Sequence, residues 1–440
     1  MKNNFIKSTI ILIFGGFITK ILGMIIKIAL TRAISTEGIG VYSLVLPTFN
    51  LFITLCSLGL PIAISKLISE GEHNNKKMIL SIIPIMLVFN FILMIILFAI
   101  SPLLSTYLLK NNDTYYPLMA IGLTLPFICV SSILKGYFFG KEQMFPATLS
   151  NIIEQLVRLA LTVTLIPNLM HYSLSIAICG VVLINIISEF ASIIVLIVFL
   201  PKNSYISPND FKYDIPLLKD LLNISIPTTG SRLLGSLTYF LEPIILTFVL
   251  VSVGYSNKFI TVEYGIINGY VYPLLLLPSF FTMAISNALL PVISNSYSKK
   301  NYNYSKYKIK QAIVLSLIIG VPATLLFMTI PEYFLNLIYN TNEGVTYIKM
   351  IAPVFILYYI QGPLTASMQA MNMAKQAMIG TFIGSIIRIT LLFFLSFLKI
   401  GLWSLIISSL ANIIFITLQH AYYVVKALNK KNNKQLKNYY

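Results

Sequence analysis

The chain has 440 residues, of which 57% are hydrophobic and only 10% are charged, with a mean hydropathy of +0.85. Soluble globular domains carry about 25% charged residues, so this composition excludes a soluble globular protein and predicts a polytopic membrane protein. The formal net charge of +17 would suggest a nucleic-acid partner for a soluble chain. Most basic residues lie in short segments between apolar runs, so membrane orientation explains the charge and we expect no nucleic-acid partner.

Apolar runs long enough to cross a bilayer recur along the whole chain. A helix needs about 20 predominantly apolar residues to span the hydrocarbon core. The N-terminal run is too long for a signal peptide and lacks a small-residue cleavage site, so we interpret it as a retained first helix. The sequence predicts an all-α membrane protein with twelve transmembrane helices, at residues 9–31, 40–66, 79–108, 116–139, 146–168, 173–200, 222–252, 264–296, 311–338, 347–370, 377–398 and 401–427.

The first predicted span carries Lys20 and Lys27 in its interior. The two lysines are seven residues apart, two helical turns, so they share one face of the helix. Charges inside a span are costly, and they usually face a protein interior or a wet cavity along a transport path. We therefore predict an anion site at these lysines. The alternative is that they extend to the membrane surface, which is easier for Lys27 because it lies about one turn from the helix end.

Charged residues also occur in the fourth and fifth predicted spans. Glu154 precedes Arg158 by four residues, which is the favourable order for an intrahelical ion pair. We interpret this pair as structural, with a coupling or counter-ion role for Glu154 as the alternative. Lys135 lies close enough to the predicted cytoplasmic end of its span to be an anchor there. The three histidines resemble loop or interface residues, and we assign no ligand role to them (His73, His171 and His420).

The longest polar connection, at residues 201–220, divides the chain into six spans and six spans. We predict an N-terminal six-helix bundle at 1–205, a cytoplasmic linker at 206–220, a C-terminal six-helix bundle at 221–428 and a basic cytoplasmic tail at 429–440. The basic tail suits an anionic inner leaflet.

The seventh predicted span carries Arg232 after the segment PTTGS, and Glu242 directly before Pro243. Proline and glycine loosen a helix, and an arginine beside unsatisfied backbone can present a forked donor to a phosphate. We predict a substrate role for Arg232, with an interfacial arginine as the alternative. Glu242 suits a cation-coupling or proton site, or a counter-ion to a cavity base.

An internal repeat relates the two halves of the sequence. The segment from Leu134 aligns without a gap with the segment from Leu364, an offset of 230 that places Arg158 on Arg388. Gly384 stands four residues before Arg388, so Arg388 has no carboxylate at this spacing and needs another partner. Glu154, a ligand and a membrane interface are the alternatives. Six spans per repeat place both halves in the same orientation, as in transporters with a substrate cavity between two bundles.

The repeat also bears on the first helix. TKILG at 19–23 parallels SRLLG at 231–235, an offset of 212 that pairs Lys20 with Arg232 and Lys27 with Tyr239. We therefore predict a substrate site that receives Lys20 from one half and Arg232 from the other, and the repeat supports Lys27 less.

The distribution of basic residues predicts the orientation in the membrane. With the N-terminus inside, twenty of the 31 Lys and Arg lie on the cytoplasmic side, five on the opposite side, and six in or at the edges of spans. Cytoplasmic loops of membrane proteins carry such an excess, so we predict a cytoplasmic-membrane protein with both termini in the cytoplasm.

Several kinds of chemistry find no support in the sequence. The three cysteines fall within predicted spans without a CxxC pair, so we expect no disulfide and no metal site. GGFITK lacks the spacing of a phosphate-binding loop, and no HExxH or GxSxG occurs. We expect no cofactor and no enzymatic activity.

The segments TKILGMIIKIALTR, GLPIAISK, EQLVR and PTTGSR together resemble the stage V sporulation protein B family, from about Ile10 to Arg388. This polysaccharide biosynthesis family belongs to the multidrug/oligosaccharidyl-lipid/polysaccharide (MOP) flippase superfamily and is related to the lipid II flippases. The resemblance implies two six-helix bundles that form a V around a cationic central cavity, and alternating access without ATP. Lys20 matches a first-helix arginine that lies in the cavity of lipid II flippases. The number of predicted spans, twelve, differs from the fourteen spans of those flippases.

The resemblance implies an undecaprenyl-diphosphate-linked sugar as substrate, in this family a peptidoglycan precursor for the spore cortex. A coupling cation and cell-wall synthases are the further partners that it suggests. A cation-coupled multidrug antiporter of the same superfamily is the alternative, for which Glu154, Glu189 and Glu242 are the candidate intramembrane acids. A membrane scaffold for cell-wall synthases, without transport, is the third hypothesis.

Overall fold

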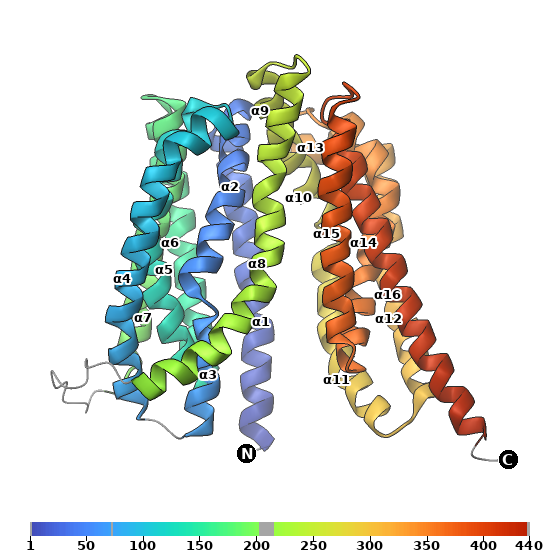
Figure 1. Cartoon of the computed structure of the whole chain (residues 1–440). Helices are drawn as coiled ribbons and strands as arrows, with labels where there is room; N and C mark the ends of the chain where they lie inside the picture. The colour runs from blue at the N-terminus through green and yellow to red at the C-terminus, as the bar shows by residue number, and fades with distance from the viewer. Residues whose placement is uncertain (1, 72–73, 202–214, 438–440) are drawn as a thin grey trace. The chain divides into compact units, whose positions relative to one another are not determined.

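The computed structural model describes residues 2–71, 74–201 and 215–437, and these ranges are helical without a β-strand (Figure 1). Shorter segments are π-helical at Leu103–Leu108 and Ile266–Val271, and 3-10 helical at Asn112–Thr114. The α-helices are α1 (Lys2–Ala33), α2 (Thr36–Ser57), α3 (Leu60–Glu70), α4 (Asn75–Pro102), α5 (Tyr115–Gly140), α6 (Met144–Met170), α7 (Leu174–Val198), α8 (Ile215–Ser252), α9 (Asn257–Gly265), α10 (Tyr272–Leu275), α11 (Ser279–Ser298), α12 (Tyr302–Thr329), α13 (Pro331–Tyr339), α14 (Val345–Ala370), α15 (Ala374–Ser396) and α16 (Trp403–Lys437).

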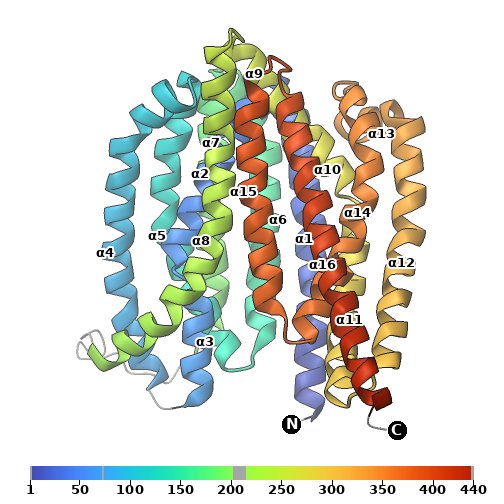
Figure 2. The same cartoon turned by 45° about the vertical axis from the view of Figure 1, so that its right-hand side comes forward.

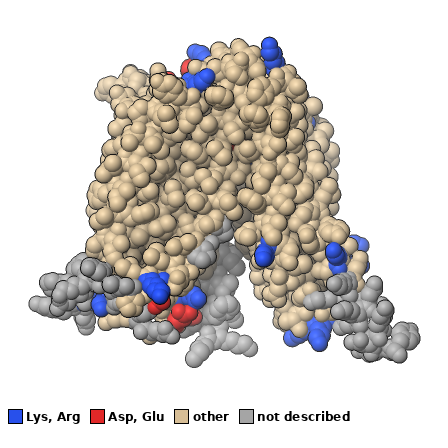
Figure 3. Space-filling model, viewed as in Figure 1, with Lys and Arg blue, Asp and Glu red and all other residues tan. Residues whose placement is uncertain are grey.

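Eleven helical segments of the described chain are long and apolar enough to cross a membrane. The segments Asn257–Leu275 and Ser279–Ser298 form a twelfth if the pair, bent by 53°, counts as one broken span. On the face that Figure 3 shows, Lys and Arg gather toward the ends of the helices, and the surface between is mostly uncharged. The chain is therefore an all-α, multi-pass membrane protein, as the composition predicts.

Besides the bent span at 264–296, two predicted spans are interrupted in the structure. The predicted span 40–66 breaks between α2 and α3, where Leu58 and Gly59 have φ angles of 41° and 63°. A Cβ on Gly59 would lie 2.5 Å from the hydroxyl oxygen of Thr228 on α8, so only glycine fits this close approach.

The second interruption corrects a boundary. We predicted one span at 311–338, whereas α12 ends at Thr329 and a separate helix, α13, begins at Pro331. Proline disfavours the helical conformation in the residue before it, and Ile330 accordingly has φ −132° and ψ 48°.

The chain forms two compact units, residues 1–247 and 248–440, and the division falls inside α8. The predicted domain boundaries at 205 and 220 stay a prediction. In the first unit α7 packs against both α5 and α6, and α6 packs along α1. In the second unit α14 packs against α11, α12 and α16, and α15 packs against α16 (Figure 2).

The N-terminal part of α8 belongs to the apolar core of the first unit. Leu217 and Leu221 are buried in a cluster with Leu60, Ile64 and Phe138 of α3 and α5. Their spacing of four residues places both leucines on one face of α8. This packing fixes the start of the helix that carries Arg232 and Glu242.

Candidate functional site

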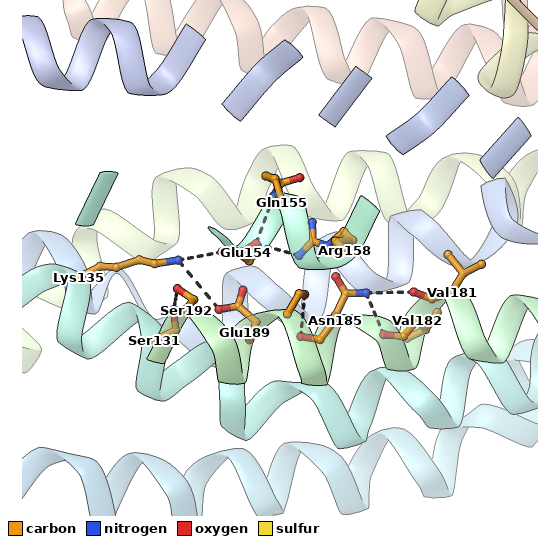
Figure 4. Close-up of polar contacts among 11 residues, drawn as sticks. Ser131, Lys135, Glu154, Gln155, Arg158, Val181, Val182, Asn185, Glu189 and Ser192 are labelled. Carbon is orange, nitrogen blue, oxygen red and sulfur yellow. Dashed lines mark hydrogen bonds and ion pairs between the residues drawn. The ribbon is translucent and has the colours of Figure 1, made fainter. Parts of the chain in front are cut away.

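Four charged side chains from three neighbouring helices meet inside the first unit (Figure 4). Lys135 comes from α5, Glu154 and Arg158 come from α6, and Glu189 comes from α7. We call these residues the four-charge cluster. The exposed fractions of their side chains are 16% for Lys135, 9% for Glu154, 24% for Arg158 and 10% for Glu189. The cluster is neutral when all four groups are ionised, which lowers the cost of burying them within a membrane span.

Glu154 is the centre of the four-charge cluster. Its Oε1 accepts a hydrogen bond from Arg158 Nη2 at 2.8 Å, and its Oε2 accepts one from Lys135 Nζ at 3.1 Å. Gln155 Nε2 donates a further bond to Oε1 at 3.3 Å. Both oxygens of this carboxylate are therefore bonded to a cation.

Glu189 is held less closely. Its Oε2 lies 4.0 Å from Lys135 Nζ, which is an ion pair but too long for a hydrogen bond. This oxygen is buried and has no hydrogen-bond partner among the described residues. The same holds for Arg158 Nε. The cluster thus contains one well-bonded carboxylate and one that depends on the charge of Lys135.

Close packing of α5 against α3 positions Lys135. A Cβ on Gly136 would lie 2.9 Å from the Cα of Pro61, so the glycine lets the two backbones approach. Between α5 and α7, the hydroxyls of Ser131 and Ser192 lie 3.5 Å apart. One turn before Glu189 on α7, Asn185 Nδ2 donates a hydrogen bond to the carbonyl of Val182 at 2.8 Å.

Two of these contacts test interpretations of the sequence. The Glu154–Arg158 ion pair, predicted from its i, i+4 spacing, is present in the structure. The interpretation of Lys135 as an interfacial anchor is wrong, because its ammonium group is half-buried between two carboxylates. Glu189 was recognised as an intramembrane acid, but its partner was not. Lys135 and Glu189 are 54 residues apart, and no local pattern joins them.

The predicted substrate cations on α1 differ in exposure. Lys20 is exposed, whereas Lys27 is half-buried. Both lie on the helix that packs along α6, which carries Glu154 and Arg158. Arg32 is exposed in the last turn of α1.

The candidate residues on α8 lie in the same unit as the lysines of α1. Arg232 is exposed and Glu242, ten residues later, is buried. Lys20, Lys27, Arg232 and Glu242 all precede residue 248 and so belong to the first compact unit. Their roles in substrate binding and coupling stay predictions.

The second unit holds Arg388, the repeat counterpart of Arg158, and this arginine is half-buried on α15.

His420 on α16 corrects an interpretation of the sequence, because it is buried rather than in a loop or at an interface. Its Nδ1 lies 3.0 Å from the hydroxyl of Thr365 on α14, within hydrogen-bonding distance. His171 is exposed at the end of α6, as expected, and His73 lies outside the described residues.

The motifs that surround these side chains match a known family. The family model described as polysaccharide biosynthesis protein matches residues 5–297. The chain belongs to this family. A second model, MatE, matches residues 267–394. The resemblance inferred from TKILG, GLPIAISK, EQLVR and PTTGSR is therefore confirmed.

Curated relatives from Bacillus subtilis cover most of the chain. Stage V sporulation protein B is 35% identical over 97% of this chain and 85% of its own length. The lipid II flippase MurJ is 23% identical over 89% of this chain and 77% of its own length. These similarities support a MOP-superfamily flippase or transporter, and one of the two relatives, MurJ, is named as a flippase.

Solved structures show the same fold. An inward-facing multidrug resistance MATE-family transporter of the MOP superfamily matches with a TM-score of 0.72 at 14% identity, over 94% of this chain and 96% of that one. A MOP-superfamily transporter from Pyrococcus furiosus, described as having a binding pocket of reverse polarity, matches with a TM-score of 0.58 at 15% identity, over 97% and 96%. At these identities the likeness establishes the fold alone.

Proposed function

We propose that this chain moves an undecaprenyl-diphosphate-linked sugar, a peptidoglycan or cell-wall polysaccharide precursor, across the cytoplasmic membrane by alternating access. The similarity to stage V sporulation protein B over 97% of the chain carries the proposal. The similarity to a lipid II flippase supports the same substrate class. In this scheme both termini lie in the cytoplasm, and cell-wall synthases consume the sugar on the other side.

The diphosphate binds to the basic residues of α1 and α8. Lys20 and Lys27 offer ammonium groups, and Arg232 offers a planar fork that suits two phosphate oxygens. Moving the negative charge of a diphosphate through the membrane costs less free energy when cations line its path. Lys20 and Arg232 carry most of this role because they are the pair that the repeat relates.

A membrane carboxylate couples the transport cycle to a cation. Glu242 is buried on α8, ten residues after Arg232, and Glu154 is buried on α6 between two cations. In this scheme the cation that pairs with the carboxylate changes when the helices around it rearrange. Arg158 and Arg388 serve as the structural or cavity charges in each unit.

The proposal is tested with full-length protein in liposomes that contain a fluorescent, undecaprenyl-diphosphate-linked sugar. Translocation is measured by the accessibility of the sugar to a membrane-impermeant quencher. Lys20→Ala and Arg232→Ala each reduce the rate at least about tenfold, since each removes a charged hydrogen-bond donor to phosphate. Lys20→Arg retains most of the rate. Arg32→Ala, at the end of the same helix as Lys20, is the matched control and leaves the rate within about twofold.

A full translocation rate in both alanine variants would remove Lys20 and Arg232 from the site. A wild-type protein that moves no lipid-linked sugar would contradict the flippase and favour a scaffold for cell-wall synthases. The MatE match at residues 267–394 favours a second candidate, a cation-coupled multidrug antiporter. Loss of cationic-dye export in Glu242→Gln, with lipid-linked sugar transport unchanged, would decide for the antiporter.

A further inference from the structure

The turn between α11 and α12, at the lower end of the second unit in Figure 2, concentrates positive charge. Five lysines occur within twelve residues, and the sequence from Tyr264 to Pro331 contains no Asp or Glu. No carboxylate of the same segment therefore neutralises the turn. The five lysines are Lys299, Lys300, Lys306, Lys308 and Lys310.

A cavity of about 480 Å³ opens at this turn. Its size lies within the range of about 300–1,000 Å³ that is usual for small-molecule sites. The lining combines an ammonium group with amides, a hydroxyl and a phenol, all of which can donate hydrogen bonds to phosphate oxygens. The lining residues are Val292, Asn295, Ser296, Lys299, Asn301 and Tyr304.

Tyr304, which lines the cavity, and Tyr307 both lie near a second lysine, Lys308. Lys308 Nζ lies 5.5 Å from the ring centroid of Tyr304 and 5.6 Å from that of Tyr307, within the range of a cation–π contact. Lys308 also donates a hydrogen bond to Gln311 Oε1 at 3.0 Å. Both rings are exposed. Tyrosines and lysines in this arrangement, at the start of an apolar span, are typical of the level of lipid headgroups.

The corresponding turn of the first unit, between α3 and α4, differs in its sequence. The repeat offset of 230 that places Pro61 on Pro291 also relates the two turns. In the first unit Lys66 forms an ion pair with Glu70 at 3.7 Å, and the sequence from Pro61 to Thr106 contains no tyrosine. The excess of basic residues that sets membrane orientation therefore does not by itself explain the tyrosine–lysine arrangement of the second unit.

We propose that the α11–α12 turn binds the phosphate of an anionic lipid headgroup from the surrounding bilayer. Lys299 bonds to the phosphate in the cavity, and Lys308, held on its tyrosines, adds a second cation at the rim. Each lysine near an anionic membrane surface strengthens such binding about fivefold. This site is separate from the substrate cations of α1 and α8, and it does not depend on the transported substrate.

The experiment measures binding of a fluorescent short-chain phosphatidylglycerol to the full-length protein in a neutral detergent. We expect phosphatidylglycerol to bind at least about tenfold more tightly than phosphatidylcholine of the same chain length. The double variant Lys299→Gln/Lys308→Gln lowers the affinity for phosphatidylglycerol by about ten- to thirtyfold. Lys306→Gln/Lys310→Gln removes the same charge from the same turn, outside the cavity lining, and lowers the affinity less than about threefold.

Three results would overturn the proposal. Equal losses in the two double variants would show that diffuse charge, and not the cavity, attracts the lipid. Equal affinity for phosphatidylcholine would remove the requirement for an anionic headgroup. Displacement of the lipid by inorganic phosphate at a comparable concentration would assign the cavity to a soluble phosphate. Unchanged thermal unfolding of both variants confirms that the comparison is between folded proteins.

Discussion

In the first unit α5, α6 and α7 meet around four charged side chains, whereas α14 and α16 of the second unit are joined by a neutral hydrogen bond between Thr365 and His420. The internal repeat relates the two junctions position by position. At the offset of 230, Thr365 stands for Lys135 and Gly384 for Glu154, and Arg388 matches Arg158. At the offset of 227, Ile416 stands for Glu189.

Different contacts fill the same positions in the second unit. The hydroxyl of Thr365 is bonded to His420, where Lys135 reaches two carboxylates. A Cβ on Gly384 would lie 2.5 Å from Asn412 Oδ1, so the absence of a side chain lets the asparagine of α16 approach α15. Close packing and one neutral hydrogen bond take the place of the ion pairs.

This difference shows that three helices of this repeat pack together without buried carboxylates. Buried ion pairs are weak evidence for stability, because desolvation offsets much of their attraction. The charges of the first unit are thus not needed to hold the junction, which favours a role for them in the proposed transport cycle. The comparison yields four predictions about the size of each contact's contribution to stability.

The largest effect is expected for Lys135→Met. The variant leaves Glu154 and Glu189 buried with only Arg158 as a cation, so the free energy of unfolding falls by about 3–5 kcal/mol. Unfolding by SDS in mixed micelles measures the loss. Thr365→Val at the counterpart position removes one neutral hydrogen bond and costs about 1 kcal/mol. Equal losses in the two variants would contradict the distinction between a charged and a neutral junction.

A second effect concerns the space that Gly384 leaves. Gly384→Ala places a methyl group against Asn412 Oδ1, and such overpacking lowers the free energy of unfolding by about 1–3 kcal/mol. Gly16→Ala on α1 is the matched control, because no heavy atom lies within 4 Å of its added Cβ. The control gains up to about 1 kcal/mol through helix propensity. If Gly384→Ala left the free energy of unfolding unchanged, the packing of Asn412 would not depend on the absence of a side chain at residue 384.

A third effect isolates Glu189. In a double-mutant cycle, Glu189→Gln recovers part of the loss caused by Lys135→Met, with a coupling energy of about 1–2 kcal/mol. Recovery is expected because Glu189 Oε2 has the charge of Lys135 near it but no hydrogen bond from the described residues. As a control, the double-mutant cycle of Lys135→Met with Glu142→Gln gives no coupling energy, because Glu142 is an exposed acid in the α5–α6 turn. Independent effects of Lys135 and Glu189 would remove Glu189 from the cluster.

These contrasts also mark what the sequence could predict. The spans and the Glu154–Arg158 pair follow from local spacing, and both are present in the structure. Lys135 was misplaced because its partners lie 19 and 54 residues away, and tertiary packing decides which helices meet. His420 was misplaced for the same reason, since Thr365 is 55 residues away. The end of α12 before Pro331, in contrast, follows from proline chemistry and could have been predicted.

The smallest effect is expected at the surface of the second unit, where Lys349 and Glu332 form an ion pair at 2.9 Å. This distance is shorter than the 3.1 Å between Lys135 and Glu154. However, the side chains of Lys349 and Glu332 are 43% and 49% exposed, so water and salt screen their attraction. We expect Lys349→Ala to leave the unfolding midpoint unchanged within experimental error, in contrast to Lys135→Met.

The pH dependence of this surface pair gives the same comparison a second readout. The hydrogen bond from Lys349 holds the pKa of the Glu332 carboxyl below its usual value. A carboxyl whose pKa is lower in the folded state stabilises the fold above its unfolded pKa, about 4.3, and loses this contribution as the pH falls through the folded pKa. Because the carboxyl is exposed to water, wild type and Lys349→Ala should unfold alike from pH 7 down through this range. If Lys349→Ala lowered the midpoint as much as Lys135→Met, the ion-pair distance rather than burial would determine the contribution of a charge pair in this fold.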